Sequence, residues 1–214
     1  FSVLLDANGE AVETNTDSVA AVSEEDAVLY AQSVLGGSAT GYYGIYRYML
    51  SQTDAGETLA VFLDGGLKVY DPMFNNIFEF KTEDLPTAMV FSDDNRNFAV
   101  ACPKAGNGGL GSVIYLLNTG MEDYSQAVTV QVSDGIPLKV EYLDRQSVLV
   151  VYDRFAAIYN VSDGTEKARY DFGANQLQSA AVSGKNTVLL FGDGEHTELT
   201  RFVVLDTNLA AVGQ

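Results

Sequence analysis

The chain has 214 residues, of which 47% are hydrophobic and 19% are charged. This composition supplies enough apolar material for a sizeable core and excludes a disordered tail. Twelve basic residues stand against 29 acidic ones, and the formal charge of −17 excludes nucleic acid and anionic lipid surfaces as partners. A single cysteine, Cys102, and a single histidine, His196, exclude an internal disulfide, a thiolate metal cluster and any mechanism that needs two imidazoles.

The first 44 residues predict an acidic head. Residues 1–14 predict a β-hairpin around the turn dipeptide Asn8-Gly9. A helix is predicted over 24–35, because Ser23 and three following acids form an N-terminal cap and apolar residues then recur at helical spacing. No run reaches the roughly 18 apolar residues of a membrane span. Because the chain begins with Phe1 inside a predicted strand, we expect it to be a piece of a longer protein.

The remaining residues contain an internal repeat. Residues 58–71 align without a gap on 147–160, and each copy has a five-residue apolar run, a short turn and a second strand. Similar apolar runs begin near residues 59, 98, 148 and 188. Alternating strands are predicted before these runs at 45–51, 87–92, 137–143 and 176–182. Further strands are predicted after them near 76–80, 124–131, 166–172 and 208–214.

This repeat predicts a mainly β protein of propeller-like, four-stranded units. The span from Ile45 to Gln214 gives about 42 residues per repeat, which is the length of a propeller blade. The predicted repeats cover about 45–86, 87–136, 137–175 and 176–214. Four blades seldom close a ring, so either the first hairpin completes a fifth, irregular blade or the chain belongs to a larger propeller. We favour the first, because the strand pattern runs to Gln214 with no further repeat.

Two resemblances accompany this pattern. The repeats resemble WD-like and quinoprotein-like β-propeller blades in period and pattern, although the chain has no Trp; this resemblance implies a scaffold or binding surface. Residues 1–10, 22–28, 41–48 and 61–64 resemble the extracytoplasmic sensor segment of clostridial membrane histidine kinases. That resemblance implies a sensor at the cell surface of a Gram-positive-type bacterium, held by a membrane anchor that this chain lacks. No kinase catalytic motif is present, so only the location and the sensing role carry over.

A group of tyrosines around one arginine is the first candidate site, for a ligand or a partner. The group consists of Tyr42, Tyr43, Tyr46, Arg47 and Tyr48. Tyrosine is typical of recognition surfaces because it offers a large contact area at a small entropy cost. Alternating tyrosines on one strand are also typical of ordinary packing.

The second candidate is a metal site near the end of the chain. Asp193, Glu195 and His196 cluster there and could hold a divalent cation through their oxygen and nitrogen atoms. The alternative is a solvated hairpin tip. Residues 6–10 hold half of a calcium-loop pattern but lack its closing Glu, and the Asn-Gly turn already explains their spacing. We therefore expect no cofactor, with Ca²⁺ as the alternative.

Two further motifs indicate structure rather than chemistry. Residues 106–111 satisfy the G-x-G-x-x-G fingerprint of dinucleotide sites, but a strand follows where the pyrophosphate needs a helix, so we expect a hairpin loop. Acidic clusters at 23–26 and 92–95 could pair as the carboxylates of a glycosidase. We interpret the first as the helix cap and the second as a polar turn between two strands.

The sequence therefore favours a non-catalytic, extracytoplasmic sensor or interaction module of a membrane-anchored bacterial protein. Its partner would be a protein, a small molecule or a glycan. One alternative is a carbohydrate-active propeller enzyme that uses paired carboxylates, and another is a structural assembly domain. These hypotheses differ in what they require: a cleft with two carboxylates for the enzyme, and self-association for the assembly domain.

Overall fold

In the computed structural model, the described residues are 4–5, 11–12, 45–53, 56–63, 66–71, 75–106, 109–121, 127–192 and 199–213. Within these ranges the chain forms strands and turns, and it holds no helix that could cross a membrane. The predicted helix at 24–35 lies outside the described residues.

The chain divides into two compact units. The first contains residues 1–52 and 56–83, and the second contains residues 53–55 and 84–214. In the first unit, β1 (Leu4–Leu5) pairs antiparallel with β2 (Ala11–Val12), with Leu4 opposite Val12 and Leu5 opposite Ala11. The predicted turn at Asn8-Gly9 lies outside the described residues. The separation of residues 1–44 as a domain of their own, and closure of the repeats into a ring, stay predictions.

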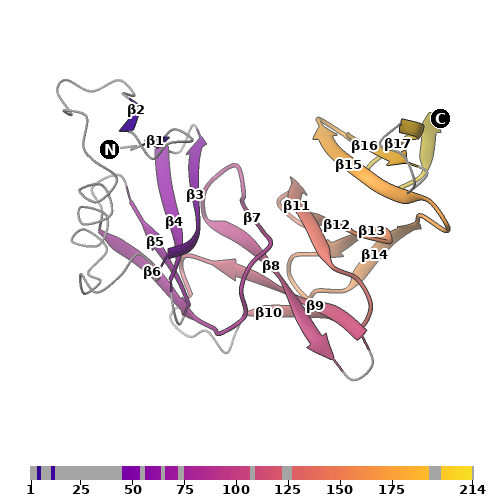
Figure 1. Cartoon of the computed structure of the whole chain (residues 1–214). Coiled ribbons are helices and arrows are strands. Elements are labelled where there is room, and N and C mark those ends of the chain that lie inside the picture. The colour runs from indigo at the N-terminus through magenta and orange to yellow at the C-terminus, as the bar shows by residue number, and fades with distance from the viewer. Residues whose placement is uncertain are drawn as a thin grey trace. The chain divides into compact units, whose positions relative to one another are not determined.

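Four antiparallel sheets of four strands each follow along the chain, coloured from purple to yellow in Figure 1. The sheet of the first unit consists of β3 (Ile45–Thr53), β4 (Gly56–Leu63), β5 (Gly66–Tyr70) and β6 (Asn76–Lys81). The second unit begins with β7 (Ala88–Phe91), β8 (Asn97–Gly106), β9 (Gly109–Asn118) and β10 (Val128–Val132). Its next sheet consists of β11 (Pro137–Asp144), β12 (Ser147–Tyr152), β13 (Phe155–Asn160) and β14 (Glu166–Asp171). The last consists of β15 (Gln176–Ser183), β16 (Asn186–Gly192), β17 (Leu199–Leu205) and β18 (Ala211–Gly213). The prediction of a mainly β chain of four-stranded repeats is confirmed.

Each sheet keeps its strands in chain order, so each is a simple meander. In a meander, successive strands run in opposite directions, so the turn between the second and third strands lies at the same end of the sheet as the last residue of the fourth strand. In the second unit, this end of the sheets carries the β8–β9 turn, the β12–β13 turn and the β10–β11 loop. We call this side of the unit, formed by strand ends and their turns, the hairpin edge.

The core of the second unit consists of two layers of side chains between successive sheets. One layer joins β7–β10 to β11–β14 and includes Ala99, Ile114 and Val150. The other joins β11–β14 to β15–β18 and includes Leu149 and Leu189. All residues of β12 are buried, because neighbouring sheets cover both of its faces. This explains why its sequence is a continuous apolar run rather than an alternating one.

The same polar turn ends the third strand of every sheet. An Asp or Asn side chain there accepts a hydrogen bond from a backbone N–H group two to four residues later. The four pairs are Asp71 with Asn75 (2.9 Å), Asn118 with Gly120 (2.8 Å), Asn160 with Ser162 (3.0 Å) and Asp206 with Asn208 (2.8 Å). Such turns compete with strand pairing and end it at a fixed place. They explain why the strand predicted over 208–214 begins only at Ala211.

The described residues of the glycine-rich motif, 106 and 109–111, belong to the paired strands β8 and β9, so the predicted hairpin is confirmed. Gly106 pairs with Gly109 across the hairpin, and β9 continues as a strand where a dinucleotide site would need a helix. Gly111 passes so close to the end of β10 that a Cβ atom there would overlap the carbonyl oxygen of Val132. At Gly109, by contrast, a Cβ atom would meet nothing within 4 Å.

The acidic cluster at 92–95 forms the turn between β7 and β8, also as predicted. The Ser92 hydroxyl donates a hydrogen bond to Asp94 Oδ1 (2.7 Å) and accepts one from the Asn97 backbone N–H (3.0 Å). The hydrogen bond from Ser92 is the main cause that lowers the pKa of the Asp94 carboxyl, and the Arg96 backbone N–H adds to it. This network assigns the cluster a structural role.

The close approach at Gly111 yields a matched pair of variants. We expect Gly111→Ala to lower the free energy of unfolding by about 1–3 kcal/mol, because the obstructing atom is backbone and β9 or β10 must shift. Gly109→Ala should change it by less than about 1 kcal/mol. Urea unfolding followed by far-UV circular dichroism measures both. Equal effects of the two substitutions would contradict the described packing.

The Ser92 turn predicts a pH effect. A carboxyl whose pKa is lowered in the folded state stabilises the fold at neutral pH, and this stabilisation is lost as the pH falls through the lowered pKa. We expect Ser92→Ala to raise the pKa of Asp94 and to reduce the difference in stability between neutral and acidic pH. Carbon-detected NMR titration of the Asp94 carboxyl measures this directly. An unchanged Asp94 titration in the variant would refute the assignment.

Candidate functional site

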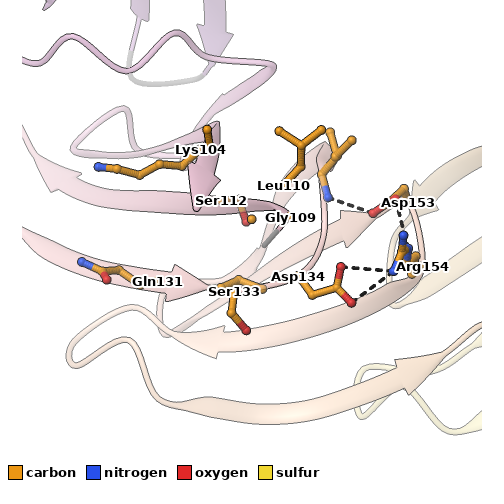
Figure 2. Close-up of a pocket in the computed structure, with 13 residues that line it drawn as sticks. Lys104, Gly109, Leu110, Ser112, Gln131, Ser133, Asp134, Asp153 and Arg154 are labelled. Carbon is orange, nitrogen blue, oxygen red and sulfur yellow. Dashed lines mark hydrogen bonds and ion pairs between the residues drawn. The ribbon is translucent and has the colours of Figure 1, made fainter. Parts of the chain in front are cut away.

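A pocket of about 1030 Å³ lies at the hairpin edge of the second unit (Figure 2). Three segments line it: the β8–β9 hairpin, the end of β10 with the loop to β11, and the β12–β13 turn. The lining therefore comes from two successive repeats. Its residues are Lys104, Ala105, Gly109, Leu110, Gly111, Ser112, Gln131, Val132, Ser133, Asp134, Ile136, Asp153 and Arg154.

Arg154 links the two carboxylates of the pocket, as Figure 2 shows. Its Nη1 atom lies 3.2 Å from both carboxylate oxygens of Asp134. Its Nε atom lies 3.6 Å from Oδ2 of Asp153. The side chains of Arg154 and Asp134 are 67% and 68% exposed, so water weakens their attraction. This pair can open at little cost and exchange its contacts for those of a bound molecule.

Asp153 has a second role, because it joins the two repeats. Its Oδ1 atom accepts a hydrogen bond from the Ile136 backbone N–H (2.8 Å), and its own N–H donates to the Ile136 carbonyl (3.0 Å). The neighbouring Gly135 N–H donates to the Leu110 carbonyl (3.1 Å), which ties the loop to the β8–β9 hairpin. These bonds hold the wall of the pocket in place while Arg154 stays near the solvent.

Lys104 lies at the other end of the pocket from Arg154 (Figure 2). Its Nζ atom is 3.4 Å from Asp84 Oδ2, and Tyr115 donates a hydrogen bond to the same oxygen. The lysine side chain is 55% exposed, so this ion pair is also weak. The pocket thus has a cation at each end and two carboxylates beside one of them.

A buried group of aromatic side chains lies next to Ser112 in the structure. The Tyr152 and Tyr159 hydroxyls are 3.1 Å apart, and the Tyr152 ring stacks on Phe155 at 4.2 Å between centroids. Burial is the main cause that raises the pKa of Tyr152, the adjacent Tyr159 adds to it, and the Ser112 hydroxyl opposes it. Gly135 has a φ of +141° and lies against the Phe155 ring, so a side chain there would be strained and obstructed. The buried Phe155 ring thus lies directly against the loop at Gly135.

The arrangement suits binding rather than a particular reaction. Paired charges, hydroxyls and backbone groups can be exchanged for the polar groups of a partner, and Leu110 adds an apolar contact with 54% of its surface exposed. Among the described residues, no three side chains of the His, Cys, Asp or Glu type converge in a way that could hold a metal ion.

The structure describes only three of the candidate site residues that the sequence singled out. Tyr46, Arg47 and Tyr48 belong to β3, in the first unit. Tyr42 and Tyr43 lie outside the described residues, as do the metal candidates Asp193, Glu195 and His196. Their proposed roles stay predictions.

Sequence reasoning missed the pocket, although the glycine-rich motif at 106–111 supplies three of its residues, Gly109, Leu110 and Gly111. The charged residues of the pocket carry only the signals of turns in the sequence. Asp134 begins an Asp-Gly turn dipeptide, and Asp153 follows an apolar run at the same place in the repeat as Asp64. Both were signals of turns. Their approach to one guanidinium depends on how two sheets pack, and no local pattern contains that information.

Solved structures with the same arrangement of sheets are β-propellers. Sqt1 from Chaetomium thermophilum matches with a TM-score of 0.58 and 16% identity over 78% of this chain and 45% of that one. The Pan2 WD40 domain of Neurospora crassa has a TM-score of 0.53 and 13% identity over 79% and 51%. The Cps50 (Swd1) propeller domain of Myceliophteria thermophila has a TM-score of 0.53 and 11% identity over 79% and 56%. The chain spans about half the length of these structures, and the likeness establishes the β-propeller fold.

The sequence comparisons give a family. No curated protein matches the chain. A family model does match, over residues 11–213, and its description is a family of unknown function, DUF5711. Because the match covers nearly the whole sequence, the chain belongs to the family DUF5711.

Proposed function

We propose that this chain is an interaction module that binds a partner protein in the pocket at the hairpin edge. In the complete protein, the module would be an extracytoplasmic sensor or binding domain, held at a bacterial membrane by an anchor outside this sequence and carrying out no catalysis. The resemblance of residues 1–10, 22–28, 41–48 and 61–64 to kinase sensor segments supports the location.

The observation that carries the proposal is that segments of two successive repeats build one pocket. Lys104 of the β8–β9 hairpin and Arg154 of the β12–β13 turn are 50 positions apart in the sequence, and each contributes a cation to the pocket. Hydrogen bonds from Asp153 and Gly135 fix the wall between them. A preformed wall with exchangeable ion pairs lowers the cost of binding, because little has to be ordered on contact.

The size and composition of the pocket favour a protein segment. Leu110 is exposed and offers an apolar contact to a partner. The same pocket is lined by two cations, Lys104 and Arg154, and by two carboxylates, Asp134 and Asp153. Interfaces combine these features, with apolar contacts at the centre and polar groups at the rim. The excess of acids in the chain favours a partner surface with a net positive charge.

A carbohydrate-active enzyme is the second candidate, because the pocket brings Asp134 and Asp153 to one guanidinium. A glycosidase needs one carboxyl that stays protonated as the general acid. Here both carboxylates contact Arg154, and Asp153 also accepts a backbone hydrogen bond. These contacts engage both oxygens of each carboxylate, so neither side chain can meet a substrate without first losing a contact.

Photo-crosslinking tests the binding surface. We expect a benzoylphenylalanine at position 110, in the full-length protein in its natural host, to give a discrete adduct with a partner protein. The same residue at position 85 is the control, because Leu85 is similarly exposed, at 49%, but does not line the pocket. Protease added to intact cells should remove the adduct if the domain is extracytoplasmic. Equal labelling from both positions, or none from position 110, would overturn the binding surface.

A glycoside panel tests the second candidate. We expect the wild-type chain to release no nitrophenol from aryl glycosides above the rate of buffer alone. Should turnover occur, Asp134→Asn and Asp153→Asn must each abolish it while the circular dichroism spectrum stays unchanged. Turnover that behaves in this way would replace the binding proposal with a catalytic one.

A further inference from the structure

The ion pair between Arg154 and Asp134 uses only part of the hydrogen-bonding capacity of the guanidinium. One nitrogen, Nη1, contacts both oxygens of Asp134, at 3.2 Å each. Charge-assisted hydrogen bonds are usually about 2.7–2.9 Å long, and a guanidinium binds a carboxylate best with two nitrogens, one on each oxygen. A second guanidinium that approached Asp134 with two nitrogens would therefore bind it better than Arg154 does.

The two carboxylates beside Arg154 differ in how firmly they are held (Figure 2). Asp153 is fixed through Oδ1 by the Ile136 backbone N–H and faces Arg154 with Oδ2, at 3.6 Å from Nε. The Asp134 carboxylate, by contrast, has hydrogen bonds and ion pairs only with Arg154 among the described residues. If Asp134 leaves Arg154, the guanidinium still has Asp153 beside it. Asp134 is thus the carboxylate that can be exchanged.

The charges around Arg154 favour a cation as the bound group. Arg154 already lies beside two carboxylates, so a carboxylate from a partner would be the third around one guanidinium. A cation would instead give two cations and two carboxylates. Lys104 does not change this count, because it is paired with Asp84. The formal charge of −17 acts in the same direction, since it attracts cations and repels anions at long range.

The Ser112 hydroxyl indicates that the pocket holds a further polar group. Ser112 is 3% exposed, and its buried Oγ atom makes no hydrogen bond within the described ranges, although it lies near the Tyr152 hydroxyl. It lies on the same face of β9 as Ile114, which packs on β11–β14, so the hydroxyl points toward the sheet that carries Arg154. A buried polar group without a partner is costly, and in a pocket wall it indicates a water molecule or a polar group of a bound molecule.

Leu110 gives the pocket an apolar surface beside these polar groups. It lies two residues before Ser112, on the same face of β9, and 54% of its surface is exposed. The methylene groups of a lysine or arginine pack well on such a surface while the charged end stays with a polar partner. The pocket therefore matches a long basic side chain along its whole length.

We propose that the pocket receives a basic side chain of the partner protein, preferably an arginine, which binds Asp134 in place of Arg154. This inference rests on the proposed function, because it requires the pocket to be the binding surface. The incoming side chain packs on Leu110, and a backbone carbonyl of the same partner segment accepts a hydrogen bond from the Ser112 hydroxyl. Arg154 keeps its contact with Asp153. In the free protein, Arg154 is thus an internal competitor for the carboxylate that the partner binds.

An internal competitor has a recognisable effect on binding. Removal of the Arg154 charge frees Asp134 and strengthens binding of a basic partner, whereas removal of the Asp134 charge weakens it. A partner that offered a carboxylate would give the reverse, because Arg154 would then be its receptor. The signs of the two effects therefore distinguish the two kinds of partner.

The test adds second substitutions to the full-length protein with benzoylphenylalanine at position 110. The adduct is measured early in the irradiation, when its yield follows the occupied fraction of the pocket. We expect Asp134→Asn to lower the yield about fivefold or more, because hydrogen bonds to charged groups are the strong ones. Arg154→Gln should raise the yield about twofold, since the exposed ion pair that it removes is weak.

Asp171→Asn is the matched control. Asp171 is 69% exposed, close to the 68% of Asp134, and also pairs with an arginine, Arg169, but it does not line the pocket. Its substitution removes the same charge from the chain and should leave the adduct yield unchanged. Circular dichroism of the purified variants verifies that they are folded.

The remaining outcomes count against the inference. An adduct yield that is unchanged by Asp134→Asn, or that falls equally with Asp134→Asn and Asp171→Asn, would overturn the basic side chain while the binding surface stands. A lower yield with Arg154→Gln would do the same and would indicate an acidic partner. Absence of any adduct from position 110 before a second substitution is added would overturn the proposed function, and this inference with it.

Discussion

The fold of the second unit depends on one constraint. A four-stranded sheet with two apolar faces is stable only when other side chains bury both faces. The sheet β11–β14 shows how this is met, because Val150 packs toward the preceding sheet while Leu149 and Val151, its neighbours in the chain, pack toward the next one. Burial of apolar surface is the dominant favourable term in folding. The order and spacing of the sheets follow from it, and each sheet depends on its neighbours for stability.

This constraint applies to the faces of the sheets, so the residues at the strand ends and in the turns are available to contact other molecules. The pocket lies at the hairpin edge, where the polar residues Asp134, Asp153 and Arg154 belong to connections rather than to buried strands. It exists only because two sheets are packed together, since neither repeat alone brings all its walls into place. The hydrogen bonds between Asp153 and Ile136 run from one repeat to the next, so the packing that stabilises the fold also positions the binding surface. The Gly135–Leu110 bond holds the loop to the β8–β9 hairpin of the same repeat.

The acidity of the chain has a partly structural origin. Asp71, Asp94, Asp144, Asp163 and Asp206 each accept a hydrogen bond from a backbone N–H group in a turn. A carboxylate is a strong acceptor for such groups, and the turns recur in every repeat. Repetition therefore accumulates negative charge at the turns, whereas the side chains between successive sheets stay apolar.

The sequence by itself determined the repeat, its length, its four strands and the nature of its turns, because these depend on residues close together in the chain. The apolar run at Val148–Tyr152 and the glycines at 106–111 were understood correctly for this reason. Only the tertiary structure decided which residues share a site. Asp134 and Asp153 resemble ordinary turn residues in the sequence. Their roles depend on which sheet lies next to which, and hydrophobic periodicity specifies that a face must be covered but not what covers it.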